Sequence, residues 1–278
     1  MTRPIALLTD FGLDDTYVAQ MKAVLAGIAP DALVLDISHA VRPHDIAHGA
    51  FLLETALPVL PAGTVVIAVV DPGVGGERAA VVLVTPRTIL VGPDNGILWP
   101  QAAAARAADE PADFFELTNS GYWRDQVSNT FHGRDVFAPV GARLALAGDD
   151  ELNALLSDMG RPLEAARRLE LERAAELDGK LRGRVLHQDR FGNLVTNIRG
   201  EQIPDPGNAA VLVEDGARVL ELGAPARTYS QYDHLVALVG SAGYLELAIP
   251  SGSAARLFGA RAQTLQITVR TSRRTSPE

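Results

Sequence analysis

Short apolar runs alternate with amphipathic stretches along the first part of the chain. Runs with the length and β-branched content of buried strands cover residues 5–9, 32–37, 64–70, 79–85 and 88–91. Stretches with helical spacing of apolar residues, or rich in alanine, cover residues 17–29, 43–57, 102–108 and 136–147. This alternation is typical of an open, mostly parallel sheet with helices on both faces. The sequence therefore predicts an N-terminal α/β domain over residues 1–165.

The pattern changes after a charge-rich segment over residues 160–179, which shows little sign of a strand. Short strands separated by Gly, Asn and Pro are predicted at 180–188, 194–198, 209–213, 218–222, 235–239, 244–249 and 264–270. A run of strands that follows a strand–helix alternation indicates a separate all-β unit. We expect a linker over 166–179 and a barrel-like β domain over 180–278, with a frayed tail at 271–278.

Polar residues follow the predicted strands of the first domain. Asp10 follows the first strand, His39 the second and Asp71 the third. Because the carboxyl ends of parallel strands meet at one edge of a sheet, where ligands bind, these side chains are candidates for one site. The run Pro72-Gly73-Val74-Gly75-Gly76 lets the backbone approach a ligand and brings Arg78 back beside Asp71. The alternative is an ordinary turn with a capping Asp and a solvated Arg.

Asp10, Asp14 and Asp15 lie in one loop. Clustered carboxylates can hold a metal ion, accept the hydroxyls of a ribose or bind an ammonium group. Asp14 or Asp15 can instead cap the helix that follows. The loop alone leaves these possibilities open.

His132 stands in the run Phe-His-Gly-Arg-Asp at the start of a predicted helix. A histidine there can exchange protons near neutral pH, or it can serve as a capping or core residue. His39, His44 and His48 lack the glutamate pattern of helical zinc sites. We therefore expect these three histidines to have structural or supporting roles.

Composition and charge exclude several classes of function. The 278 residues contain no cysteine, which excludes disulfides and thiolate chemistry and suits the cytoplasm. With 34 acidic and 25 basic residues the net charge is -9, which argues against a nucleic-acid partner. The N-terminal MTRPIALLTD is typical of a first strand and not of a signal peptide. Apolar runs are too short to cross a membrane.

Six motifs occur along the chain in this order: Leu8-Thr9-Asp10-Phe11-Gly12 with Asp15, Asp71-Pro72-Gly73-Val74-Gly75 with Arg78, Gly92-Pro93-Asp94-Asn95-Gly96, Phe131-His132-Gly133-Arg134-Asp135, Asp189-Arg190-Phe191-Gly192-Asn193-Leu194 with Thr196-Asn197, and Gly240-Ser241-Ala242-Gly243-Tyr244-Leu245. In this order they resemble the S-adenosyl-L-methionine (SAM) hydroxide adenosyltransferase family. Its members are SAM hydrolases, related to enzymes that fluorinate or chlorinate the same substrate.

This resemblance implies hydrolysis of SAM to adenosine and L-methionine without a metal or organic cofactor. It also implies a homotrimer with sites between the N-terminal domain of one subunit and the C-terminal domain of its neighbour. Matched to the family, the water-activating residues are Asp71, Arg78 and His132. The matched substrate contacts are Asp10 for the ribose, Asp15 for the methionine end, Asn193 and Tyr229 for the adenine, and Ser241 for the methionine carboxylate.

The chain departs from the halogenating relatives at four places. They have a serine at the position of Gly133, an aromatic residue at the position of Asp71 and an extra loop after the first strands. They also have an arginine where this chain has Ala242, so here the carboxylate must rely on Ser241 and backbone N–H groups. The resemblance thus favours water over halide as the nucleophile.

Two other functions remain open from the sequence. The run from Thr9 to Asp15 loosely resembles the calcium loop of metal-dependent nucleoside N-ribosyl hydrolases, although Leu8 stands where that class has a further aspartate. A sensor that binds an adenosyl ligand without turnover is the second alternative.

Overall fold

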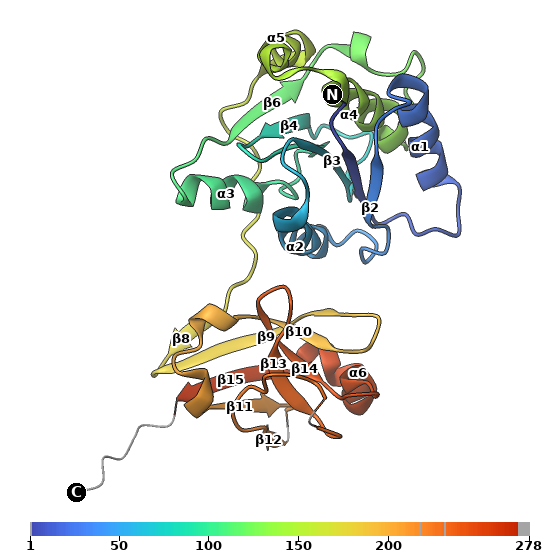
Figure 1. Ribbon diagram of the computed structural model, residues 1–278. Helices are drawn as coiled ribbons and strands as arrows, with labels where there is room; N and C mark the ends of the chain where they lie inside the picture. Colours follow the sequence, from blue (N-terminus) through green and yellow to red (C-terminus); the bar gives the residue numbers. More distant parts are fainter. Residues whose placement is uncertain (1, 217, 231, 272–278) are drawn as a thin grey trace, which may run out of the picture. The chain divides into compact units, whose positions relative to one another are not determined.

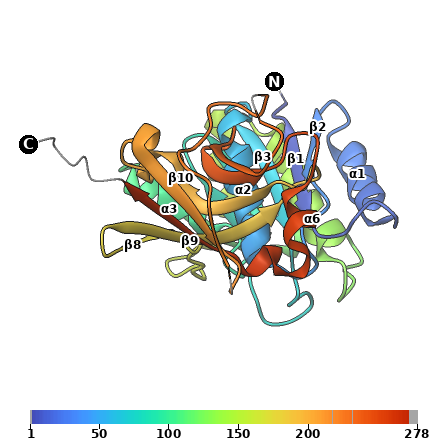
Figure 2. The ribbon, with the colours of Figure 1, turned by 90° about the horizontal axis from the view of Figure 1, so that it is seen from below.

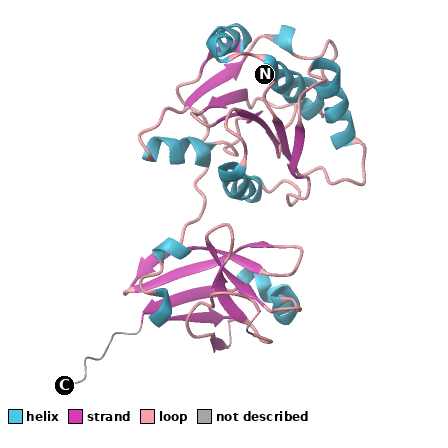
Figure 3. Ribbon diagram, viewed as in Figure 1, coloured by secondary structure: helices cyan, strands magenta, loops and turns pink. Residues whose placement is uncertain are grey.

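The computed structural model describes residues 2–216, 218–230 and 232–271. The chain forms two compact units that divide between Leu171 and Glu172 (Figure 1). This division lies inside the segment 166–179 that the sequence predicts as a linker. Helices and strands mix in the first unit, whereas strands dominate the second (Figure 3). An α/β part followed by a β part is therefore confirmed. None of the described helices is long and apolar enough to cross a membrane.

A seven-stranded sheet in the order β2-β1-β3-β5-β4-β6-β7 forms the centre of the first unit. Its strands are β1 (Ile5–Thr9), β2 (Val34–Ser38), β3 (Thr64–Val69), β4 (Ala80–Val84), β5 (Thr88–Pro93), β6 (Asp113–Leu117) and β7 (Gly160–Pro162). The pairs β1–β2, β1–β3 and β3–β5 are parallel. The pairs β4–β5, β4–β6 and β6–β7 are antiparallel. The sheet is therefore mixed, and the prediction of a mostly parallel sheet needs correction.

The short β4–β5 connection explains the difference. Thr85 N–H donates to the Thr88 carbonyl at 3.0 Å, and a turn this tight can only join antiparallel strands. An apolar run carries no sign of its direction, so the pattern at 79–85 predicts a strand without its orientation.

Among the described residues of this unit, the α-helices beside the sheet are α1 (Tyr17–Ile28), α2 (Ile46–Ala56), α3 (Trp99–Ala107), α4 (Ala138–Leu146) and α5 (Asp149–Met159). Alternate residues of a strand point to opposite faces, so Leu7 and Ile67 lie in one core cluster and Leu8 and Val66 in another. The first cluster includes residues of α1, α4 and α5, and the second includes residues of α2 and α3. Figure 1 shows these two helix groups on opposite sides of the sheet.

The predicted helix over 136–147 begins as a π-helix, Gly133–Phe137, which continues into α4. Strand β6 and helix α5 are elements that the sequence reading did not include.

The second unit is a curled antiparallel sheet, comparable to half of a barrel, in the order β12-β11-β15-β9-β10-β14-β13 with β8 beside β9. Its long strands β9 and β10 lie side by side in Figure 2. Its elements are β8 (Ala175–Leu177), β9 (Lys180–Gln188), β10 (Leu194–Arg199), β11 (Ala209–Glu214), β12 (Val219–Glu221), β13 (Val236–Val239), β14 (Tyr244–Ala248), β15 (Gln266–Thr271) and the short helix α6 (Ala254–Phe258).

Two strands, β7 and β8, form within the segment 160–179 where the sequence shows little sign of one. All three residues of β8 are exposed, so the strand has no apolar signature. The prediction of a frayed tail falls, apart from Thr271 in β15, on residues outside the described part of the chain.

Candidate active site

Asp71 follows β3 on the glycine-rich loop. Val74 N–H donates to the Asp71 carbonyl at 3.2 Å, which turns the chain sharply after the strand. Gly75 has a φ of 76°, and a Cβ atom there would lie 2.2 Å from the carbonyl oxygen of Asn129. Only glycine allows this approach. The loop therefore lies directly against the segment that leads to His132.

The guanidinium of Arg78 joins Asp71 to His132. Its Nε donates to both carboxylate oxygens of Asp71 at 3.1 Å, and its Nη2 donates to Oδ2. The same Nη2 lies 2.8 Å from Nδ1 of His132. The side chains of Arg78 and Asp71 are only 10% and 4% exposed, so this ion pair is shielded from water. Three residues from two separate motifs thus form one hydrogen-bonded cluster.

The contact with Arg78 fixes the tautomer of His132. Guanidinium nitrogens are donors only, so Nδ1 of His132 accepts and the neutral ring carries its proton on Nε2. Burial and the charge of Arg78 lower the pKa of His132, against the opposing effects of Asp71 and Asp135. The imidazole is therefore neutral at pH 7, with Nε2–H as its donor.

Asp135 anchors the helix start that carries His132. Its buried carboxylate accepts from Arg134 Nε at 2.6 Å, from Arg124 Nη1 at 2.9 Å and from the backbone N–H of Ser128 at 2.9 Å. Burial alone would raise the pKa of Asp135, but the hydrogen bonds from Arg134, Ser128 and Arg124 lower it overall. This ionised group ties the preceding loop to the π-helix and so fixes the position of His132.

Asp10, the residue after β1, is held from two sides. Its Oδ2 accepts from the backbone N–H of His44 at 2.8 Å. The neighbouring Thr9 hydroxyl lies 2.8 Å from Nδ1 of the buried His39, and Gly12 N–H donates to the His39 carbonyl at 2.8 Å. The loop after β1 is therefore bonded to the segment after β2, which orients the Asp10 carboxylate.

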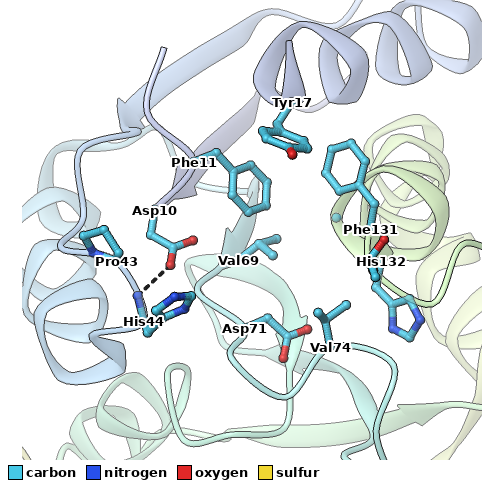
Figure 4. Close-up of a pocket in the computed structure, with 12 residues that line it drawn as sticks. Asp10, Phe11, Tyr17, Pro43, His44, Val69, Asp71, Val74, Phe131 and His132 are labelled. Atoms are coloured by element: carbon cyan, nitrogen blue, oxygen red, sulfur yellow. Dashed lines mark hydrogen bonds between the residues drawn. The ribbon is translucent and has the colours of Figure 1, made fainter. Parts of the chain in front are cut away.

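A cavity of about 290 Å³ brings Asp10, Asp71 and His132 together, as Figure 4 shows. Its other lining residues are Phe11, Tyr17, Pro43, His44, Val69, Val74, Thr130, Phe131 and Gly133. The rings of Phe11, Tyr17 and Phe131 have centroids 5.2 to 5.8 Å apart and form an aromatic wall. Apolar walls with a few convergent polar groups are typical of small-molecule sites, and the size suits a nucleoside.

Asp15 lies elsewhere. It is exposed and is not among the residues that line this cavity. The N-cap position of α1 belongs to Thr16, so neither Asp14 nor Asp15 is the cap residue that the alternative reading expects. Among the described residues, no three His, Asp or Glu side chains are arranged to hold a metal ion.

The remaining predicted contacts lie in the second unit. Asn193 closes the turn before β10, where its Nδ2 and its backbone N–H both donate to the Asp189 carboxylate at 2.8 Å. Tyr229 donates its hydroxyl to the buried Glu246 at 3.2 Å. Burial and the nearby Glu246 raise the pKa of Tyr229 to about 12. Burial, reinforced by Asp189, raises the pKa of Glu246 despite the bond from Tyr229.

Ser241 is exposed on the turn between β13 and β14. A Cβ atom at the preceding Gly240 would lie 1.8 Å from Oε1 of Glu246, so a larger residue there would displace this carboxylate.

Comparison with known proteins decides the family. The model of the SAM hydroxide adenosyltransferase N-terminal domain matches residues 5–154, and the model of the C-terminal domain matches residues 183–265. The chain belongs to the SAM hydroxide adenosyltransferase family. It is 42% identical over 264 residues to an "(R)-S-adenosyl-L-methionine hydrolase" of Thermus thermophilus, with 92% of this chain and 96% of that protein covered.

A hydrolase of the same name from Salinispora tropica is 40% identical over 262 residues, which cover 92% of this chain and 93% of that protein. A fluorinase of Nocardia brasiliensis is more distant, at 27% identity over 295 residues, with 94% and 95% covered. A solved structure of a conserved protein from Thermotoga maritima superposes with a TM-score of 0.83 at 31% identity, covering 96% of this chain and 99% of that one.

In this SAM hydroxide adenosyltransferase the surroundings of Gly133 are crowded. A Cβ atom there would lie 3.3 Å from the sulfur of Met21 and from the ring of Phe131, and 3.4 Å from the ring of Phe11. The serine expected in the halogenating relatives would therefore require these neighbours to move.

The sequence analysis expects a structural or supporting role for His44. The structure places His44 in the cavity wall, where its backbone N–H holds Asp10. The sequence analysis gives no role to Asn95. The Nδ2 of Asn95 donates to the carbonyl of Val70 at 2.7 Å, just before Asp71. The aromatic wall was within reach of sequence reasoning, since Phe11 and Phe131 belong to the quoted motifs.

Proposed function

We propose that this protein hydrolyses SAM to adenosine and L-methionine by attack of water on the ribose C5′ carbon. The observation that carries this proposal is the Asp71–Arg78–His132 cluster in the wall of a cavity that also contains Asp10. The relatives named SAM hydrolase share this substrate in their names. No metal or organic cofactor is needed for the reaction.

The reaction balances without a general acid at the leaving group. The water oxygen forms a bond to C5′ while the C5′–S bond breaks. The electron pair of the C5′–S bond passes to sulfur and gives the neutral thioether of methionine. The water proton must leave. Asp71 is its acceptor, because a carboxylate offers more lone pairs than Arg78 occupies.

His132 and Arg78 orient the water and stabilise its developing negative charge. His132 donates from Nε2, since its Nδ1 already accepts from Arg78. Assistance from a general base contributes about 10²–10⁴-fold. Holding water and C5′ in line contributes up to about 7–11 kcal/mol, so positioning is the larger effect.

Asp10 binds the ribose hydroxyls in this proposal, and Asp15 helps to hold the methionine end. Attack removes the sulfonium charge, so acids near it favour the bound substrate over the transition state. Their contribution is therefore to affinity and not to rate.

The proposed active form is a cytoplasmic homotrimer. Asn193, Tyr229 and Ser241 belong to the second compact unit, and we propose that the unit of a neighbouring subunit supplies them to the site. In this arrangement Asn193 and Tyr229 contact the adenine, and Ser241 contacts the methionine carboxylate.

The test is incubation with SAM in ¹⁸O-water, with parallel samples that contain EDTA or chloride. We expect label in the 5′-hydroxyl of adenosine, and unchanged activity with EDTA. Free adenine, or loss of activity with EDTA, would support a metal-dependent N-ribosyl hydrolase instead. Binding of SAM without products would support a sensor, and a 5′-chloro nucleoside would show that halide competes with water.

A further inference from the structure

His44 has an unusual backbone conformation for a residue in a cavity wall. Its φ is 66°, in the left-handed region that residues other than glycine rarely occupy. Hydrogen bonds on both sides hold it there: Asp45 N–H donates to the Arg42 carbonyl at 3.0 Å, and the Asp45 carboxylate accepts from His48 N–H at 2.9 Å. Backbone strain maintained in this way is concentrated at functional sites.

The strained conformation has a specific result for Asp10. It directs the His44 N–H to Oδ2 of Asp10 at 2.8 Å, while the second oxygen of Asp10 faces the middle of the cavity in Figure 4. The imidazole of His44 also lines the cavity, on the side of Asp71. A group held by Asp10 therefore lies within reach of the His44 ring.

We infer that the His44 imidazole is a further substrate-binding residue, which donates a hydrogen bond to a ribose hydroxyl of the nucleoside held by Asp10. This inference rests on the proposed function, in which Asp10 binds the ribose. A carboxylate only accepts, so it pairs with the hydrogen of a hydroxyl and leaves the hydroxyl oxygen to a donor. The imidazole supplies that donor.

The test is adenosine binding, measured by calorimetry with the full-length protein. His44→Gly removes the ring, keeps the N–H that holds Asp10 and relaxes the backbone; His44→Ala removes the ring and keeps the strain. Both variants should bind adenosine about three- to tenfold more weakly, as expected for one lost hydrogen bond. Asp109→Gly is the control, because Asp109 also has a positive φ of 59° but does not line this cavity.

Binding of 2′-deoxyadenosine and 3′-deoxyadenosine identifies the contact. With the nucleoside that lacks the hydroxyl bound by His44, the wild type and both variants should have dissociation constants within twofold of each other. An equal loss with all three nucleosides would overturn the inference, since the ring would then act elsewhere. It would also be overturned if only one of the two variants bound adenosine more weakly, because the backbone would then be responsible.

The binding assay separates this inference from the proposed function. A protein that binds adenosine in a His44-dependent way but does not hydrolyse SAM would contradict the proposed function alone. A protein that hydrolyses SAM, with adenosine binding unaffected by His44→Gly, would contradict this inference alone. A wild type that binds no adenosine would overturn the inference as well.

Discussion

At the scale of single residues, Arg78 gives Asp71 and His132 different hydrogen-bonding roles. Its guanidinium donates to Nδ1 of His132, so Nε2–H is the remaining donor of that ring. Asp71 retains acceptor capacity, although Arg78 bonds both of its oxygens. Only a planar group with several donors in fixed directions can serve both partners at once.

Replacing Asp71 should separate catalysis from binding. Asp71→Asn keeps the size of the side chain but removes the proton acceptor, and we expect kcat to fall about 10²–10⁴-fold with little change in adenosine affinity. Asp10→Ala should show the opposite behaviour, with a raised KM and a smaller effect on kcat. Steady-state kinetics and calorimetry on both variants check the pair. An Asp71→Asn enzyme with unchanged kcat would exclude Asp71 as the base.

The lowered pKa of His132 predicts the acid limit of activity. A protonated ring would face Arg78 with a second positive charge, so activity requires the neutral form. Since the pKa in the folded protein lies below the ordinary value of about 6.5, kcat should fall to half of its plateau value only below about pH 6.5. A pH–rate profile of the wild type, compared with His132→Gln, tests this; loss of activity already at pH 7.5 would contradict it.

The same shift has a consequence for stability. His132 binds its proton more tightly in the unfolded chain than in the folded protein. Its contribution to the free energy of unfolding is therefore present above about pH 6.5, and it is lost as the pH falls through the pKa of His132 in the folded protein. Urea unfolding of the wild type should therefore lose more stability between pH 7.5 and pH 5 than unfolding of His132→Gln.

At the scale of elements, the glycine-rich loop depends on one close contact. Gly75→Ala would place a methyl group 2.2 Å from the Asn129 carbonyl at a φ of 76°. The loop would have to move away from the segment before His132, and we expect at least a tenfold loss of kcat because positioning dominates. Gly216→Ala is the matched control: its φ is 92°, but nothing lies within 4 Å of the added atom. Equal kcat values for the two variants would contradict this role.

The elements show which features the sequence encodes. Strand β3 and Asp71 were predictable, because a buried apolar run followed by Pro and Gly has few other interpretations. The direction of β4 was not, since it depends on the tight turn at Thr85–Thr88. Strand β8 was missed because none of its residues is buried.

The candidate site, too, could be predicted only in part from the sequence. Asp71, Arg78 and His132 stand in recognisable motifs, but their contact depends on the approach of Gly75 to Asn129, which no local pattern specifies. The place of His44 in the cavity wall could not be predicted, because it follows from a positive φ held by hydrogen bonds of neighbouring residues. The cluster could thus be suspected from sequence, whereas its geometry required tertiary structure.

At the scale of the whole molecule, the predicted site residues are divided between two compact units. If neighbouring subunits share each site, two inactive variants should complement each other. Co-expressed Asp71→Asn and Asn193→Ala chains should form hybrid trimers in which about a third of the sites, one in each trimer, are intact. Activity well above that of either variant alone, measured on the purified hybrids, is the expected result. Sites contained within one chain would recover none.

The π-helix after His132 gives the molecule a particular sensitivity to chain length. A π-turn holds one residue more than the corresponding α-turn, and each α-helical residue advances about 100° around the axis. Deleting a single residue between Gly133 and Phe137 would let a regular α-helix form, and would swing the imidazole about a quarter turn away from Arg78. The rotation of one helix about its axis therefore decides whether the Asp71–Arg78–His132 cluster assembles.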